Sequence, residues 1–157
     1  MSNKPRTDPE LDVSLLVASL LYPLQDEVLI ALANAGHSQL RACHGVVLAH
    51  LHRADARLTE LATLCGQPKQ YIGRLVDELE HWGYVSRKAV VTDRRSKIIT
   101  LTAHGRAQQR DAHTALAQIE ERYEAHLGQR DYARFRQLLQ RLATCEHARA
   151  IEASTPS

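Results

Sequence analysis

Residues 57–85 read RLTELATLCGQPKQYIGRLVDELEHWGYV, and this stretch decides the fold. Its first part predicts a short helix over 59–64. A tight turn follows, because Gly66 can adopt the left-handed conformation that such turns require. Pro68 then suits the first position of a second helix, predicted over 68–81, since its missing N–H would have no partner there. Two helices joined by a tight turn indicate a helix-turn-helix.

A basic hairpin is predicted directly after this unit. Apolar and β-branched residues favour two strands, over 84–90 and 96–101, with a charged turn between them. The segment 87–97, RKAVVTDRRSK, holds five basic residues and one acid, a net charge of +4 where the whole chain carries +2. A local basic patch on a nearly neutral protein suits a focused contact with a polyanion. Helix-turn-helix plus hairpin predicts a winged helix.

Long helices are expected on both flanks, so the predicted fold class is mainly α with a small β-hairpin. An apolar residue recurs every four positions from Leu16 to Leu32, with a kink or a helix junction expected at Pro23. Ser38 is expected to cap a helix over 39–51. We expect the 157 residues to form a single domain. Its winged-helix lobe would span 40–101, and helices over 9–35 and 103–150 would bind a second copy.

Several classes of protein are excluded by what the sequence lacks. Three widely spaced cysteines and no CxxC argue against a disulfide framework or a zinc ribbon. The polar N-terminus is unlike a signal peptide, and no apolar run approaches the roughly 20 residues of a membrane span. We therefore expect a cytoplasmic protein without membrane contact. Phosphate loops, nucleophile elbows and metal triads are missing, so we expect no enzyme, no cofactor and no metal site.

The chain resembles the MarR (multiple antibiotic resistance regulator) family of winged-helix transcription regulators. The matching residues are Leu61-Ala62, Gly66, Arg74 to Glu80, Gly83, Val85, Asp93, Arg95, Leu101-Thr102 and Gly105. The resemblance implies a homodimer that binds a pseudo-palindromic operator in double-stranded DNA, most simply as a repressor. Pro68, Tyr71 and Gly73 depart from the family pattern on the surface that reads DNA, so the operator sequence cannot be transferred from relatives.

The second helix is expected to read base edges in the major groove with its N-terminal residues. These are Lys69, Gln70, Tyr71 and Arg74. Glutamine pairs with adenine and arginine with guanine, whereas Tyr71 suits a thymine methyl group or a phosphate. The alternative is that these four are ordinary solvent-facing residues.

The hairpin tip is expected to enter the minor groove. By resemblance Arg95 is the inserted arginine and Asp93 orients it, and Arg94 is expected to contact phosphate. The flanking cations Arg87, Lys88 and Lys97 are expected to add further phosphate contacts. The alternative is a solvated charged turn.

The sequence indicates least about the signal that controls the protein. MarR-like proteins often bind small aromatic acids beside the dimer helices, and Tyr22, Arg41, His44 and Val47 are candidates for such a pocket, although each is more often packing or surface. A redox- or metal-responsive regulator of the same fold is an alternative, with Cys65 the first thiol to test. A winged helix that contacts only proteins is a third class, which the basic wing disfavours.

Overall fold

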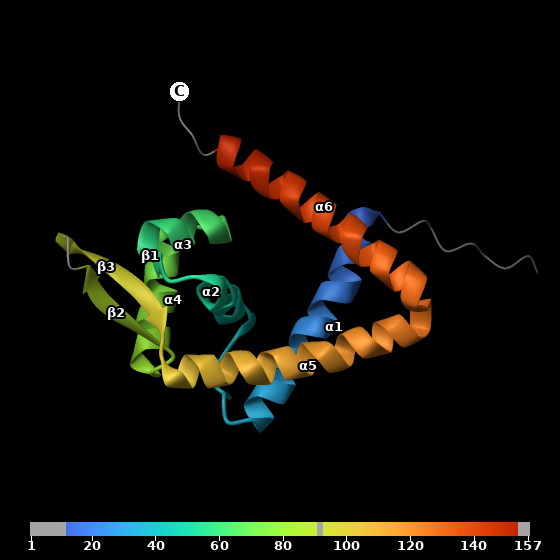
Figure 1. Ribbon diagram of the computed structural model, residues 1–157, viewed down its shortest axis with the longest axis horizontal. Helices are drawn as coiled ribbons and strands as arrows, with labels where there is room; N and C mark the ends of the chain where they lie inside the picture. Colours follow the sequence, from blue (N-terminus) through green and yellow to red (C-terminus); the bar gives the residue numbers. More distant parts are fainter. Residues whose placement is uncertain (1–11, 91–92, 154–157) are drawn as a thin grey trace, which may run out of the picture.

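The computed structural model describes residues 12–90 and 93–153. Within these residues the chain forms six helices and three strands (Figure 1). In chain order they are α1 (Val13–Asn34), α2 (Ala42–Arg53), β1 (Ala56–Arg57), α3 (Leu58–Cys65), α4 (Lys69–His81), β2 (Val85–Val90), β3 (Asp93–Leu101), α5 (Ala103–Leu127) and α6 (Gln129–Ala153). The predicted class, mainly α with a small antiparallel sheet, is confirmed.

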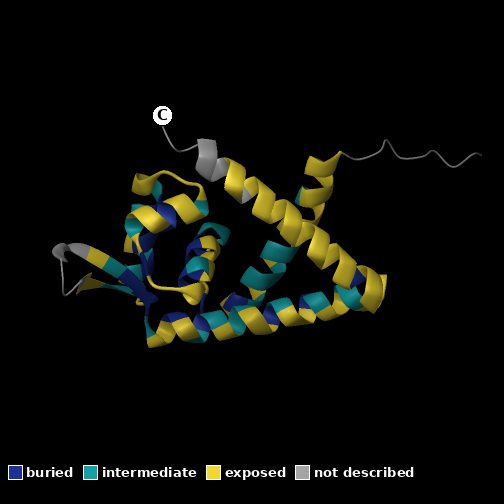
Figure 2. Ribbon diagram, turned by 45° about the horizontal axis from the view of Figure 1, so that its top comes forward, coloured by how far each residue is buried: buried dark blue, intermediate teal, exposed yellow. Residues whose placement is uncertain are grey.

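The core lies in a lobe made of α2, α3, α4 and the sheet. Each of these elements turns an apolar face inward, with Val47, Leu61, Val76 and Ile99 almost fully buried. Figure 2 shows this concentration of buried residues at one end of the molecule. The lobe therefore forms a packed body that can present α4 and the hairpin in a fixed relation to one another.

The terminal helices are far more exposed than the lobe. Helix α5 leads away from the sheet, α1 crosses it, and α6 folds back from its far end (Figure 1). Large apolar side chains lie exposed on α1 and on α6, and Figure 2 shows most of α6 as exposed. Such apolar surface on a monomer indicates a surface that meets a partner.

Helix α1 corrects one expectation from the sequence. By length and composition it could cross a membrane, with a mean hydropathy of 1.6 in its most apolar stretch. The apolar stretch is interrupted by Ser14 and Ser19 and is followed by Gln25, Asp26 and Glu27. Glu27 forms an ion pair with Arg122 of α5, at 2.7 Å, and Leu32 reaches the core of the lobe. The C-terminal half of α1 is thus built into the protein.

The sheet contains a strand that the sequence did not reveal. β1 has two residues, and it pairs with β3, which gives the antiparallel order β1-β3-β2. Ala56 lies opposite Ile99 in that pairing. β2 and β3 form the predicted hairpin, with Val85 opposite Leu101.

Two helix starts differ from those predicted. Helix α2 begins at Ala42 with Arg41 as its N-cap residue, whereas Ser38 was expected to cap it. The His44 ring provides the cap instead, because its Nδ1 accepts the Arg41 backbone N–H at 3.0 Å. Helix α1 begins at Val13, capped by the Asp12 carboxylate, and contains Pro23 within a single helix. The start expected near residue 9 lies outside the described residues.

A glycine sets the junction between the sheet and α5. Gly105 is buried in the first turn of α5, and a Cβ added there would lie 2.1 Å from the Tyr84 carbonyl oxygen. Thr102 caps the helix and also donates its hydroxyl to the Gly83 carbonyl at 2.6 Å. Helix α5 therefore starts in close contact with the backbone that leads into β2.

Candidate nucleic-acid interface

Helix α4 divides into a buried and an exposed face. Gly66, with φ of +61°, ends α3 in the left-handed conformation, and Pro68 is the N-cap residue of α4. Ile72, Leu75, Val76 and Leu79 face the core. Three of the predicted DNA-reading residues, Lys69, Gln70 and Arg74, are exposed together over the first turns. A helix that offers cationic and amide side chains from its N-terminal turns suits base edges and phosphates.

Tyr71 differs from its three neighbours. Its ring is half-buried and packs against the core of the lobe. The Arg74 guanidinium lies 5.3 Å from the centre of the same ring, within the range of a cation–π contact. The tyrosine ring therefore helps to position Arg74, and its contact with DNA stays a prediction.

Glu78 ties the middle of α4 to the start of α2. Its Oε2 accepts hydrogen bonds from Arg41 Nη2 at 2.6 Å and from His44 Nε2 at 2.8 Å. Since His44 Nδ1 accepts a backbone N–H, the ring is neutral and carries its proton on Nε2. The His44 hydrogen bond, aided by the Arg41 charge, lowers the pKa of the Glu78 carboxyl below its usual range.

Arg87 connects the wing to α4. Its guanidinium donates to Glu80 and, at 2.6 Å, to Asp77, while its backbone N–H donates to Glu80 Oε1 at 3.0 Å. The Arg87 side chain is only 20% exposed. Its charge is thus committed to two carboxylates of the recognition helix, which makes it a brace between two parts of the interface. The predicted phosphate contact of Arg87 stays a prediction that competes with this brace.

The remaining wing cations lie on the hairpin strands. Lys88 and Lys97 are both exposed. The strand register shifts beyond them: Ala89 pairs with Lys97, whereas Val90 pairs with Asp93. The register leaves Arg94, Arg95 and Ser96 as extra residues on β3, which interrupts the regular pairing as a β-bulge does. The side chains of Asp93, Arg94 and Arg95 lie outside the described residues.

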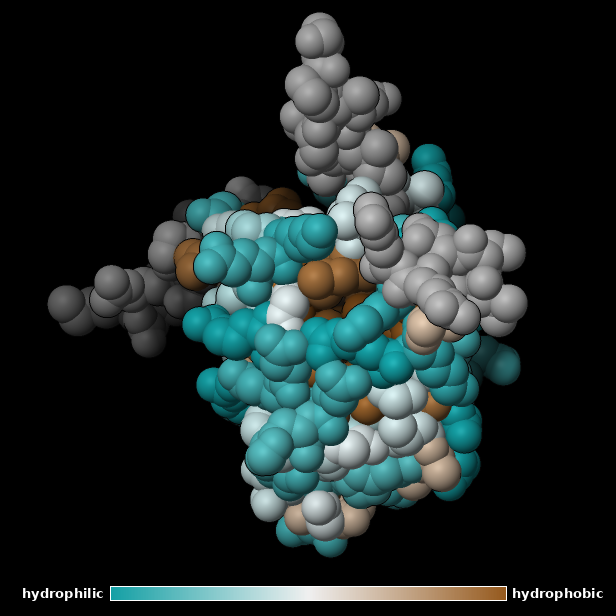
Figure 3. All heavy atoms as spheres, turned by 90° about the vertical axis from the view of Figure 1, so that its left-hand side faces the viewer, coloured by the Kyte–Doolittle hydropathy of each residue, from teal (hydrophilic) through white to brown (hydrophobic). Residues whose placement is uncertain are grey.

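Figure 3 shows the end of the molecule that carries the wing. Hydrophilic side chains cover much of the visible face, and hydrophobic atoms reach the surface in the centre and in smaller spots toward the edges. A polar, cation-bearing surface of this kind fits a nucleic acid better than an apolar protein partner.

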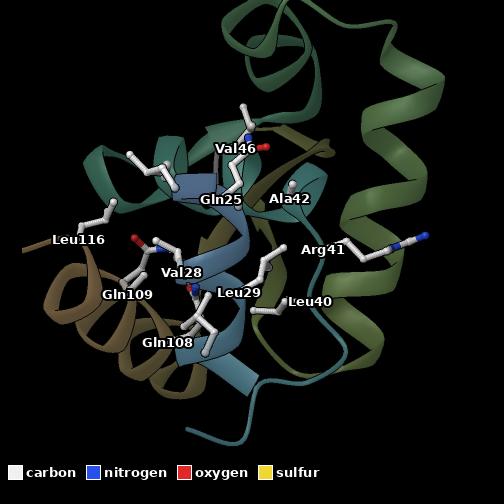
Figure 4. A pocket seen from close by; sticks show the side chains of 15 residues that line it. Gln25, Val28, Leu29, Leu40, Arg41, Ala42, Val46, Gln108, Gln109 and Leu116 are labelled. Atoms are coloured by element: carbon white, nitrogen blue, oxygen red, sulfur yellow. Dashed lines mark hydrogen bonds between the residues drawn. The ribbon is translucent and has the colours of Figure 1, made fainter. Parts of the chain in front are cut away.

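A cavity of about 270 Å³ lies between α1, α2 and α5. Its wall is mainly apolar, with polar groups from Gln25, Arg41, Gln108 and Gln109 (Figure 4). Sequence reasoning missed the three glutamines, which carry no recognisable motif.

Only one of the four predicted pocket residues, Arg41, lines this cavity. His44 and Val47 are fully buried in the core instead, because they lie on the inner face of α2. Tyr22 is exposed on α1. Apart from Arg41, this cavity is lined by residues that were not predicted, and a ligand role for the four candidates stays a prediction.

The thiols offer little support for the redox alternative. Burial raises the pKa of the Cys65 thiol, which lowers its thiolate fraction and its reactivity at neutral pH. Cys43 and Cys65 both line a smaller cavity of about 180 Å³ beneath Tyr71. Among residues 12–90 and 93–153, no group of three metal-ligating side chains comes together.

The comparisons with known proteins agree with this architecture. Residues 40–96 match the sequence model of the MarR family. No curated protein sequence matches the chain significantly. Among solved structures, MarR from Escherichia coli shares the fold at 19% identity, with a TM-score of 0.68 over 85% of this chain and 98% of that one. The resemblance to the MarR family is thus confirmed, by sequence over the lobe and by fold over most of the chain.

Three further structures, of two proteins, hold a bound molecule. CouR from Rhodococcus jostii RHA1, bound to p-coumaroyl-CoA, is 28% identical over 84% of this chain and 92% of that chain, with a TM-score of 0.67. CouR is also similar when bound to a 23-mer DNA duplex, at 29% identity, 83% and 89% coverage and a TM-score of 0.68. A Mycobacterium tuberculosis MarR family protein in complex with p-aminosalicylic acid is 28% identical, covers 85% and 99%, and has a TM-score of 0.64.

Proposed function

We propose that this MarR-type winged-helix protein is a transcriptional repressor that binds a pseudo-palindromic operator as a homodimer and is released by a small molecule. Helix α4 would enter the major groove and the β2–β3 wing the adjacent minor groove. Such a protein acts in the cytoplasm, where its DNA is, and performs no catalysis.

The observation that carries the DNA proposal is the exposed face of α4 beside a basic hairpin. Lys69, Gln70 and Arg74 project from a helix whose other face is locked into the core. Arg87 fixes the hairpin against the same helix through Asp77. CouR, which is similar in fold and sequence, binds a DNA duplex, and this supports the same use of the surface here.

The exposed apolar faces of α1 and α6 support the homodimer. On α6 the side chains of Leu138, Leu139 and Leu142 are 44%, 50% and 63% exposed, and α1 adds Leu16 and Leu20. Burying such faces against a second copy stabilises both chains by about 25 cal/mol per Å² of apolar surface. A symmetric pair would place two α4 helices for half-sites about 10 base pairs apart.

The DNA proposal is tested with a duplex that the protein selects from a random pool. Fluorescence anisotropy at 50 to 200 mM salt should show tight binding that weakens steeply with salt, as expected for several phosphate contacts. Analytical ultracentrifugation should show two chains per duplex. In a reporter strain carrying the selected site in a promoter, the protein should lower expression. Salt-indifferent binding, or none, would contradict the proposal.

A small-molecule effector is supported by the cavity between α1, α2 and α5. Its volume of about 270 Å³ is near the lower end of the range for small-ligand sites. It lies where the exposed terminal helices meet the DNA-binding lobe. Two similar proteins, CouR and the M. tuberculosis protein, bind p-coumaroyl-CoA and p-aminosalicylic acid.

A further inference from the structure

His37 lies where three parts of the molecule meet. It follows α1, and its side chain is only 4% exposed. Its Nδ1 lies 2.9 Å from the hydroxyl of Tyr84, the fully buried residue that precedes β2. Its Nε2 lies 3.1 Å from Oδ2 of Asp111 on α5. One imidazole ring thus connects the end of α1, the base of the wing and the helix that leads to the terminal helices.

The two hydrogen bonds determine where the neutral ring carries its proton. An ionised carboxylate only accepts, so Nε2 carries the hydrogen and donates it to Asp111. Nδ1 is then an acceptor, and the Tyr84 hydroxyl donates to it. Within residues 12–90 and 93–153, His37 is the one hydrogen-bond partner of that hydroxyl. The hydroxyl hydrogen of Tyr84 therefore has an acceptor only while Nδ1 carries no proton.

A second proton on His37 removes this acceptor. Both ring nitrogens become donors, so the hydroxyl hydrogen of Tyr84 is left unpaired in a fully buried position. Asp111, which is 45% exposed, favours the added charge, whereas burial of the ring opposes it. His104 of α5, whose ring lies 5.1 Å from the His37 ring, also opposes it when protonated. Among the described residues, these three side chains are the titratable groups that contact His37.

Tyr84 lies at the base of the wing. Its carbonyl oxygen accepts the backbone N–H of Thr102 at 3.0 Å and lies against Gly105 in the first turn of α5. The next residue, Val85, begins β2. A change at the Tyr84 side chain therefore acts where α5 meets the hairpin. The hairpin keeps its own strand pairing and the Arg87 brace, so we expect a graded change in DNA affinity.

We propose that His37 is a positioning residue that makes operator binding sensitive to pH. The inference rests on the proposed function, because it names a signal that regulates the same DNA-binding surface. The neutral ring, bonded to Tyr84 and Asp111, holds α5 and the base of the wing in the arrangement that binds DNA. The protonated ring releases the Tyr84 hydroxyl, and DNA affinity falls. Histidine changes its charge between pH 5 and 8, so the loss belongs to the acid side of that range.

The change of hydrogen bonding is measured first without DNA, by NMR of the ¹⁵N-labelled histidine rings between pH 8 and 5. The His37 signal is the one that is lost in H37Q. At pH 8 we expect the tautomer with its proton on Nε2, and Y84F should alter the chemical shift of Nδ1. At pH 5 the ring should carry both protons. A ring with its proton on Nδ1 at pH 8, or a neutral ring at pH 5, would overturn the proposal.

Operator binding is measured next by anisotropy with the selected duplex, at pH 7.5 and 5.5 and constant salt. H37Q, whose amide carries no charge at either pH, is the reference. Relative to H37Q, wild-type affinity should fall about threefold in acid, which corresponds to the loss of one neutral hydrogen bond. Y84F should already bind about threefold more weakly than the wild type at pH 7.5, and its affinity should fall no further in acid.

A matched control is available on the same helix. H126Q removes an exposed histidine near the other end of α5 and should keep the wild-type response to pH. Circular dichroism melting of each variant at both pH values verifies that it is folded.

Three outcomes of the duplex titrations overturn the role of His37 while the DNA proposal stands. They are a wild-type response to pH that equals that of H37Q, an undiminished fall in Y84F, or loss of the response in H126Q. Failure of the wild type to bind any duplex contradicts the proposed function instead, and the NMR titration would still decide whether His37 loses its bond to Tyr84 on protonation.

Discussion

Replacing Glu80 with glutamine separates two roles for Arg87. In the structure this arginine braces the wing against α4, whereas the sequence alone predicts a phosphate contact. The glutamine can still accept the Arg87 backbone N–H, now at 3.0 Å, but loses the charge that holds the guanidinium. The two roles predict opposite changes in the DNA affinity of the glutamine variant. A weakened brace lowers DNA affinity, while removing an acid beside a released phosphate-binding arginine raises it.

The expected loss of binding free energy follows from the solvent exposure of the two carboxylates. Glu80 is 38% and Asp77 69% exposed, so solvent screens both ion pairs. For the Glu80 pair we expect a loss of about 1 kcal/mol, near the top of the range for exposed pairs and below that for buried charged hydrogen bonds. If that loss appears fully in the complex, duplex affinity falls about fivefold per subunit. Asp77→Asn, the more exposed partner, is the matched control and should cost about 0.5 kcal/mol or less.

Anisotropy titrations over a salt series measure both quantities. For E80Q we expect weaker binding with an unchanged slope of log affinity against log salt. Arg87→Gln should behave in the same way, because a brace contacts no phosphate. An increase in affinity for E80Q, or a slope reduced by about 0.9 in Arg87→Gln, would refute the brace and restore the phosphate contact.

Further substitutions test other parts of the molecule. Arg95→Ala should cost about 1–3 kcal/mol of duplex binding in anisotropy titrations, and unchanged affinity would remove it from the interface. Gly105→Ala should lower the free energy of unfolding in urea by about 1–3 kcal/mol, because the new Cβ would meet the Tyr84 carbonyl at 2.1 Å. Gly73→Ala, whose added Cβ would have its nearest neighbour at 3.6 Å, should raise the free energy of unfolding by about 0.5–1 kcal/mol. If Gly73→Ala destabilised the protein more than Gly105→Ala, the close contact at Gly105 would be contradicted. Because the pKa of Glu78 in the fold lies below its usual value of 4.5, the ionised carboxylate stabilises the fold above pH 4.5. This stabilisation is lost as the pH falls through the lowered pKa, so the melting temperature of E78Q should depend less on acid pH.

Local patterns were sufficient for the helix-turn-helix and the hairpin. Gly66 and Pro68 mark the turn between α3 and α4 through their own backbone preferences, which no distant contact overrides. The strands around the basic turn were recognisable because alternation and β-branched residues act within a few positions. Exposure of Lys69 and Gln70 likewise follows from helical periodicity once the buried face is known.

Features that depend on distant partners were not predictable. His44 and Val47 were expected at a ligand pocket, but the inward face of α2 became clear only once α4 was packed against it. The Arg87 brace depends on the angle between α4 and β2. Its seven-residue separation from Glu80 was visible in the sequence, yet only the turn between the two elements brings the charges together. Of the four predicted pocket residues only Arg41 lines the cavity. No sequence pattern around Arg41 predicted its hydrogen bond to Glu78.

The two-residue strand β1 sets a lower limit on any excised DNA-binding fragment. A hairpin of two strands is marginal in water, and Ala56 and Arg57 supply the third strand through partners at Ile99 and Ile98. That pairing joins residues more than forty positions apart, so we expect it to form after the local helices. A fragment that begins after Arg57, or that ends before Ile98, would lose this pairing and leave the hairpin without its third strand.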